Sequence, residues 1–168
     1  MEHEVDAIAR KDSVTYFVEA KHHLSYHALT GLDESRIARA ILEDVSEGFM
    51  FGRGDWKIDR AMIVTNTRYS EHATQYGKCR NILQIGWSSP ENLGLQNMIE
   101  ENRRYPLSCL RGLDGETRMK LVESGIVLIG LLLNENLREL AKKTRLPQDV
   151  LSEIVEKARF TSNVVWYT

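Results

Sequence analysis

The chain has 168 residues, of which 42% are hydrophobic and 27% charged, and its formal net charge is −2. These values are typical of a globular protein with one full core, or one domain with a small appendage. They exclude a chain that is basic throughout, although a local basic surface for nucleic acid remains compatible with them. The most apolar run, GIVLIGLLL, is shorter than the roughly 20 residues of a membrane span. Because the chain also lacks a signal peptide and has only two cysteines, at no metal-like spacing, we expect a cytoplasmic protein with no membrane contact.

The first half of the chain alternates short apolar runs with amphipathic stretches. HEVDAIA and VTYFVEAK flank the polar turn RKDS, which predicts a β-hairpin. Apolar residues at helical spacing predict a helix over 33–45, with Asp33 or Ser35 as its N-cap, followed by a glycine-rich loop. Buried strands are predicted over 59–67 and 82–87, with a helix from Ser70 between them. The order β-β-α-β-α-β predicts an α/β layer with a mixed sheet.

The second half of the chain is predicted to be helical. Strand signals end near residue 112, so we expect an α/β domain over 1–112 and an all-helical module over 113–168. The predicted segments are a helix over roughly 93–103, an extended stretch around Pro106, and three helices near 115–124, 134–143 and 147–160.

The predicted hairpin carries charged residues where a core strand should be apolar. Strand alternation places Glu19 and Lys21 on one face, opposite an apolar face that includes Val18. If the hairpin pairs residues whose numbers sum to an odd value such as 23 or 25, Asp6 lies on the charged face, beside Glu19 or Phe17. Two carboxylates opposed in this way repel each other unless a cation lies between them.

A hard divalent ion such as Mg²⁺ suits two such carboxylates, because it prefers oxygen ligands and keeps positions open for phosphate. Lys21 could then orient or deprotonate a water molecule, or stabilise charge on a phosphate. Asp6, Glu19 and Lys21 are therefore the groups that metal-assisted phosphodiester hydrolysis needs. The alternative is a solvated strand face that carries a Glu–Lys ion pair.

At these residues the sequence resembles the PD-(D/E)XK nuclease superfamily, and within it the Mrr-like restriction endonuclease branch of bacteria and archaea. The likeness is carried by HEVDAIARKD, FVEAKHH, MIVTNTRYSEHATQYGKC and QIGWSSPENLGLQNMIE, and covers roughly residues 3–112. It is similar to the nuclease module of proteins that fuse such a module to an ATP-cone domain.

The resemblance implies a restriction-endonuclease-like three-layer core with a mixed sheet. It implies that Asp6, Glu19 and the main-chain carbonyl of Ala20 bind Mg²⁺ or Mn²⁺, and that Lys21 is the catalytic lysine. DNA is the implied substrate, and no organic cofactor is expected. Val5 replaces the proline of the superfamily name. The superfamily's first helix and first strand have no counterpart before the motif, so the resemblance implies a fragment, a truncated protein, or a core completed by a partner chain.

Further residues are candidate contacts to metal or DNA. Glu4 shares the face of Asp6 and could be an outer ligand, while His22 and His23 could contact the scissile phosphate. Asn66 and Arg68 follow a buried strand, where ligand contacts in α/β sheets are usual. Candidate backbone contacts on the helix after the hairpin are Arg36 and Arg39, and a solvated helix face is the alternative for them.

The segment LAKKTRLPQDVLSEIVEKA is similar to a helix-hairpin-helix DNA-binding unit, although it lacks the Gly-x-Gly of that hairpin. Lys142, Lys143 and Arg145 supply positive charge at its turn. A packing or dimerising helical bundle is an equal alternative.

These observations predict a Mg²⁺-dependent DNA endonuclease of the restriction or DNA-repair type. Cutting both strands would require a homodimer, because one such site cuts one strand. The first alternative is a non-catalytic DNA-binding or junction-recognising protein that keeps the fold, and the second is a protein-interaction module.

Overall fold

The computed structural model describes residues 3–163, and the chain divides into two compact units between Asn97 and Met98. The predicted boundary, between residues 112 and 113, lies further along the chain. The difference arises because Leu107 and Leu110, each 2% exposed, pack into the core of the second unit. The segment that precedes the predicted boundary therefore belongs to the helical part.

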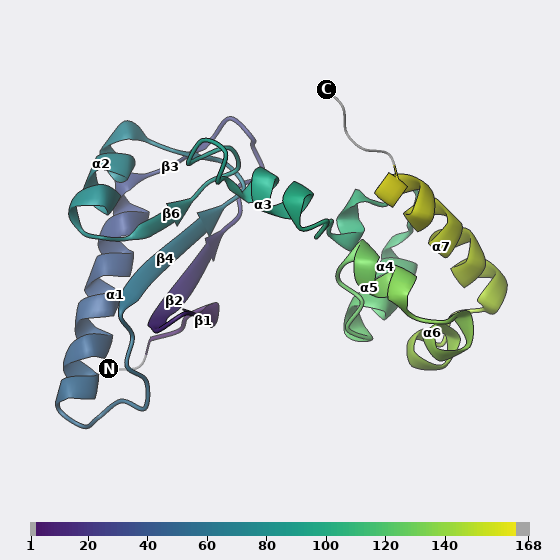
Figure 1. Ribbon diagram of the computed structural model, residues 1–168, viewed down its shortest axis with the longest axis horizontal. Coiled ribbons are helices and arrows are strands. Elements are labelled where there is room, and N and C mark those ends of the chain that lie inside the picture. The colour runs from purple at the N-terminus through teal and green to yellow at the C-terminus, as the bar shows by residue number, and fades with distance from the viewer. Residues whose placement is uncertain (1–2, 164–168) are drawn as a thin grey trace. The chain divides into compact units, whose positions relative to one another are not determined.

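The first unit is built on a four-stranded mixed sheet of order β1-β2-β4-β6, in which β1 is antiparallel to β2 and the other neighbours are parallel (Figure 1). The prediction of a mixed α/β fold is confirmed. A second, two-stranded parallel sheet was not predicted, and it joins β3 (Leu29–Thr30) to β5 (Arg68–Tyr69). The elements of the larger sheet and its helices are β1 (Ala7–Lys11), β2 (Val14–Lys21), α1 (Leu32–Met50), β4 (Arg60–Thr65), α2 (Glu71–Cys79) and β6 (Leu83–Ile85).

The hairpin has one of the two predicted registers. Ala7 pairs with Val18, so paired residue numbers sum to 25, and Asp6 lies one step further, opposite Glu19. The charged face is the face that the helices cover, because Phe17 on that face is 1% exposed. The side chains packed around Phe17 include Ala61 and Ile63 of β4, Ala38 and Leu42 of α1, and Ala73 of α2.

Helices α1 and α2 both contribute to this one buried cluster, so they cover the same face of the sheet. On the opposite face Val18 and Val64 are only partly buried. The sheet and these two helices therefore form two layers, whereas the resemblance implied helices on both faces.

Two helix starts test the sequence-based capping assignments. Ser70 caps α2 as predicted, since its hydroxyl accepts a hydrogen bond of 3.2 Å from the main-chain N–H of Ala73. The N-cap of α1 is Gly31, and the predicted caps Asp33 and Ser35 lie inside the helix. Acidic residues are favoured both at the N-cap and in the first turn, where they stabilise the helix dipole. The sequence alone therefore does not distinguish these two positions for Asp33.

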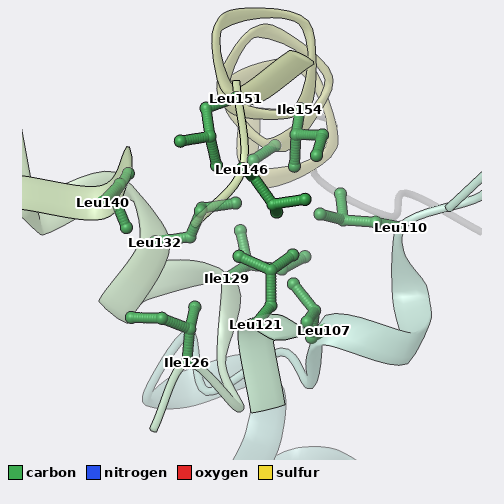
Figure 2. Close-up of a cluster of buried hydrophobic side chains, with 11 residues drawn as sticks. Leu107, Leu110, Leu121, Ile126, Ile129, Leu132, Leu140, Leu146, Leu151 and Ile154 are labelled. Atoms are coloured by element: carbon green, nitrogen blue, oxygen red, sulfur yellow. The ribbon is translucent and has the colours of Figure 1, made fainter. Parts of the chain in front are cut away.

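The second unit is helical, as predicted, and encloses a core of aliphatic side chains that point toward one another (Figure 2). Helix α5 was not predicted, because it is short and lies inside the continuous apolar run. The buried side chains are Leu107, Leu110, Leu121, Ile126, Ile129, Leu132, Leu140, Leu146, Leu151, Ile154 and Ala158. After α3 (Leu95–Glu101) and a 3₁₀ turn (Leu107–Cys109) the helices are α4 (Gly115–Glu123), α5 (Ile129–Asn134), α6 (Leu137–Thr144) and α7 (Gln148–Asn163).

Among residues 3–163, none of the helices has both the length and the apolar character needed to cross a membrane. Cys79 and Cys109 are both free and exposed.

Candidate active site

The predicted catalytic residues meet where the hairpin strands lie next to each other. The Asp6 carboxylate accepts a hydrogen bond of 2.7 Å at Oδ2 from the main-chain N–H of Ala20. This bond ties the residue before β1 to the segment Glu19-Ala20-Lys21 near the end of β2. The structure therefore brings together all four of the residues that the sequence assigns to metal binding and catalysis.

Lys21 lies between two carboxylates. Its Nζ donates a hydrogen bond of 2.7 Å to Glu19 Oε1 and lies 3.4 Å from Glu34 Oε2. The hydrogen bond that Lys21 donates to Glu19, together with the negative charge of Glu34, raises the pKa of Lys21 above its ordinary value, although burial acts in the opposite direction. Lys21 is therefore an ammonium ion at neutral pH, which suits it to stabilise negative charge and not to act as a general base.

Glu34 belongs to this cluster and was missed by the sequence analysis. It lies in the first turn of α1, and its side chain is 33% exposed. Its local pattern indicates only an acidic residue near a helix N-terminus, which is common. The contact with Lys21 joins a helix to a strand, so no local spacing in the sequence could reveal it.

A partly buried glutamine fixes the turn that carries Glu34. Gln84 of β6 donates hydrogen bonds of 2.9 Å from Nε2 to Ser35 Oγ and to the carbonyl of Ala73. Gly77 on α2 leaves room for this side chain, since a Cβ there would come within 2.4 Å of it. Gln84 thus holds the starts of α1 and α2 over the sheet and keeps Glu34 near Lys21.

Three buried threonines surround the end of β4, where Thr65 pairs with Lys21. The Thr30 hydroxyl donates to Thr65 Oγ1 at 2.9 Å and lies 3.2 Å from Thr67 Oγ1. His23 Nε2 lies 3.1 Å from the same Thr30 hydroxyl. These contacts satisfy the buried hydroxyls and fix the segment after Lys21 against the end of the sheet.

The predicted phosphate contacts His23 and Asn66 are bound to each other. The main-chain N–H of His23 donates to Asn66 Oδ1, and Asn66 Nδ2 donates to the His23 carbonyl, both at 2.8 Å. These amide groups therefore fasten the loop after β2. His22 and Glu4 are exposed beside Lys21 and Asp6 in the chain.

A pocket of about 580 Å³ adjoins this end of the sheet, and Arg68 and Asn66 both line it. Trp87, which is 42% exposed, contributes an aromatic side chain to it. The remaining lining residues are Tyr26, His27, Ala28, Leu29, Thr67 and Ser88. Of the two predicted ligand contacts after β4, Arg68 is the one whose side chain is exposed at this pocket.

The other predicted DNA contacts lie on helices. On α1 each arginine has an acidic partner, with Arg36 NH1 3.3 Å from Asp33 Oδ1 and Arg39 Nε 2.7 Å from Glu43 Oε1. In the second unit the predicted helix, tight turn and helix are present as α6 and α7. Arg145 adopts a left-handed conformation at that turn, and Lys143 forms an ion pair with Glu135. The three basic residues of this turn, Lys142, Lys143 and Arg145, are exposed.

The oxygen atoms at the hairpin match a hard cation. Asp6 and Glu19 provide two carboxylates, and Ala20 provides a main-chain carbonyl between Glu19 and Lys21. No group of three or more His, Cys, Asp or Glu side chains within residues 3–163 is placed to hold a metal ion. Mg²⁺ needs only one or two protein carboxylates and otherwise keeps water, so this donor set fits Mg²⁺ better than a closed structural metal site.

No family model matches the chain. It is 32% identical over 157 residues to an uncharacterized protein of Archaeoglobus fulgidus, a match that covers 91% of this chain and 84% of the relative. The fold is also that of the crystal structure of a protein of unknown function, with a TM-score of 0.80, 29% identity, and coverage of 95% of this chain and 81% of that one. The chain therefore belongs to the same family as the uncharacterized Archaeoglobus fulgidus protein.

Proposed function

We propose that this protein is a Mg²⁺-dependent DNA endonuclease that hydrolyses phosphodiester bonds. The observation that carries the proposal is the Asp6 carboxylate bound to the main chain of the Glu19-Ala20-Lys21 segment, with Lys21 held between two carboxylates. The resemblance of these residues to the PD-(D/E)XK nucleases supports the same conclusion. Mn²⁺ should replace Mg²⁺, because both ions accept carboxylate and water oxygens.

Each residue of the cluster has a role in this proposal. Asp6, Glu19 and the Ala20 carbonyl would hold the ion, which supplies charge neutralisation and a more acidic bound water when present. The Lys21 side chain would stabilise, as an ammonium ion, the negative charge that develops on the phosphate oxygens. Glu34 provides Lys21 with a second partner, which keeps the ammonium group in place while Glu19 serves the ion.

Basic residues outside the cluster would bind the DNA backbone. Arg68 lies beyond the end of β4, and Arg36 and Arg39 lie on α1. Within the second unit, the exposed basic turn between α6 and α7 would be a separate surface for contact with DNA. A cytoplasmic location belongs to the same proposal, as does a homodimer wherever both strands are cut.

Cleavage of supercoiled plasmid and of branched DNA, with Mg²⁺, with Mn²⁺ and with EDTA, tests the proposal. The wild-type protein should nick DNA with either ion and not with EDTA. Asp6→Asn should lower the rate by more than about 100-fold, because even the outer partners of metal ligands are worth 10–100-fold. Asp55→Asn, at an exposed aspartate between α1 and β4, is the matched control and should cut like the wild type.

A non-catalytic DNA-binding protein is the second candidate. It is favoured by the fact that the Lys21 ammonium already has two carboxylate partners within the protein, as in a purely structural ion-pair cluster. Binding without cleavage under either ion would support this candidate over the nuclease. If the protein neither binds nor cuts DNA, both candidates are wrong.

A further inference from the structure

The pocket beside Arg68 lies next to the proposed catalytic cluster. Thr65 of β4 pairs with Lys21 of β2, and the next two residues, Asn66 and Thr67, line the pocket. Two residues span at most about 7 Å, and less in a bend such as this one. A nucleotide in this pocket would therefore adjoin a phosphate held at Lys21.

The chemistry of the pocket suits a nucleotide. Trp87 and Tyr26 line it with aromatic side chains that are 42% and 82% exposed, and such rings stack on nucleobases. Arg68 adds a permanent positive charge, and no acidic side chain is among the described residues that line the pocket. Its volume of about 580 Å³ is within the range of pockets that enclose small ligands.

Hydrogen bonds on both sides of Trp87 hold its backbone at this position. Its main-chain N–H donates to the Thr67 carbonyl and its carbonyl accepts from the Gln96 N–H, both at 2.9 Å. Gly86 and Gly94 allow the close approach, since a Cβ on either would come within 2.7 Å of the carbonyl of Thr67 or of Trp87. An exposed indole on a fixed backbone binds a flat ligand at a low cost in conformational entropy.

A base inside a duplex cannot enter such a pocket, because its two faces are covered by neighbouring bases. An unpaired base exposes both faces and stacks on aromatic side chains whatever its identity. This distinction separates single-stranded, gapped or branched DNA from fully paired DNA.

Building on the nuclease function proposed above, we propose that the pocket formed by Tyr26, Arg68 and Trp87 binds an unpaired nucleotide of the DNA substrate beside the scissile phosphate. The base stacks on Trp87, and Arg68 pairs with a neighbouring phosphate. The protein therefore prefers DNA with an unpaired nucleotide at the cut over a continuous duplex.

Binding without metal tests this preference separately from cleavage. Fluorescence anisotropy in EDTA would compare a labelled duplex that has a short single-stranded gap with a continuous duplex of the same sequence. Trp87→Ala should weaken binding of the gapped DNA by about 5- to 100-fold, the range expected for loss of one base–aromatic stack, and change duplex binding by less than about 2-fold. Trp56→Ala, at an exposed tryptophan outside the pocket, is the matched control and should bind both DNAs like the wild type.

Arg68→Gln provides a second test at an exposed side chain. It should weaken binding of the gapped DNA and lower the salt dependence of that binding by about one counterion. Equal loss of duplex and gapped binding in both variants, or no loss in either, would overturn the proposal.

The two proposals fail in different ways. If Trp87→Ala selectively loses gapped DNA while the wild type cuts no DNA with Mg²⁺ or Mn²⁺, the pocket stands and the nuclease function is wrong. If the wild type cuts a continuous duplex at least as fast as gapped DNA, and Trp87→Ala cuts both at the same rate, the nuclease stands and the pocket is wrong.

Discussion

The two units differ in how their buried polar side chains are arranged. In the second unit the hydrophobic core consists of leucine, isoleucine and alanine, and the buried threonines Thr117 and Thr144 lie on separate helices. In the first unit a group of buried polar residues, Thr30, Thr65 and Thr67, gathers at one end of the sheet beside Lys21. Buried hydroxyls stabilise a fold less than methyl groups unless each finds a partner, and these find one another.

The core of the second unit and the polar end of the first unit should therefore contribute differently to stability and to the proposed function. Aliphatic packing explains the second unit without reference to any ligand. The polar end of the first unit coincides with the cluster of Asp6, Glu19, Lys21 and Glu34, in which the last three side chains are partly buried. We infer that side chains at this end are selected for their position, so substitutions in the two regions should affect different measurements.

Substitution of a core leucine in the second unit should have the largest effect on stability. Leu132→Ala removes a side chain that is 0% exposed and should lower the free energy of unfolding by about 2–5 kcal/mol. Urea denaturation followed by circular dichroism measures this loss. The neighbouring Leu131→Ala, on the same helix but 37% exposed, should cost far less. Similar losses in the two variants would contradict the core assignment.

Substitution of Lys21 should instead affect cleavage. Lys21→Gln should lower the cleavage rate by about 100-fold, as for other groups that stabilise charge in a transition state, while the free energy of unfolding falls only by the modest contribution of two partly exposed ion pairs. Lys21→Arg keeps the positive charge and should retain more activity than Lys21→Gln. If both variants lose activity to the same extent, Lys21 acts as a general base and not through its positive charge.

The pH dependence follows from the raised pKa of Lys21. A raised folded-state pKa contributes stability that is fully present below the ordinary value of 10.5 and is lost as the pH rises through the folded-state value. The contribution of Lys21 to stability should therefore be constant near neutral pH and disappear above pH 10.5. Urea denaturation across this range should show that alkaline loss in the wild type and not in Lys21→Gln.

Substitution of a buried threonine should have the smallest effect on stability. It also compares the same kind of substitution in the two units. Thr65→Val removes the acceptor for the Thr30 hydroxyl, and Thr117→Val removes the hydroxyl that hydrogen-bonds the Asp114 side chain at the start of α4. Each should cost about 1 kcal/mol in urea denaturation. Only Thr65→Val should also slow cleavage, because Thr65 pairs with Lys21. Slower cleavage by Thr117→Val would contradict the separation of the two regions.

The sequence was sufficient to predict the elements with strong local signals. Alternation of charged and apolar residues predicted an odd sum for the paired residue numbers of the hairpin, such as the 25 that the structure has, and Ser70 predicted the start of α2. The two-residue strands β3 and β5 are too short to show a periodic pattern. The domain boundary was placed too late because Leu107 and Leu110 reveal their partners only in the folded structure.

The candidate site was also predictable only in part, because some of its residues meet through contacts between separate elements. Asp6, Glu19 and Lys21 lie on one hairpin, so strand periodicity brings them together. Glu34 and Gln84 join the site through contacts between separate elements, and neither carries a local pattern that indicates such a contact. The predicted phosphate contacts His23 and Asn66 hydrogen-bond each other, and this pairing depends on the loop conformation, which has no local sequence pattern.

Location of a bound metal ion tests the central claim most directly. Crystals of the protein soaked in Mn²⁺ would be measured for anomalous scattering. We expect one strong peak in contact with the carboxylates of Asp6 and Glu19 and with the Ala20 carbonyl, and its loss in Asp6→Asn. A peak elsewhere, or no peak at this position in crystals of a protein that cuts DNA in the same buffer, would contradict the proposed site.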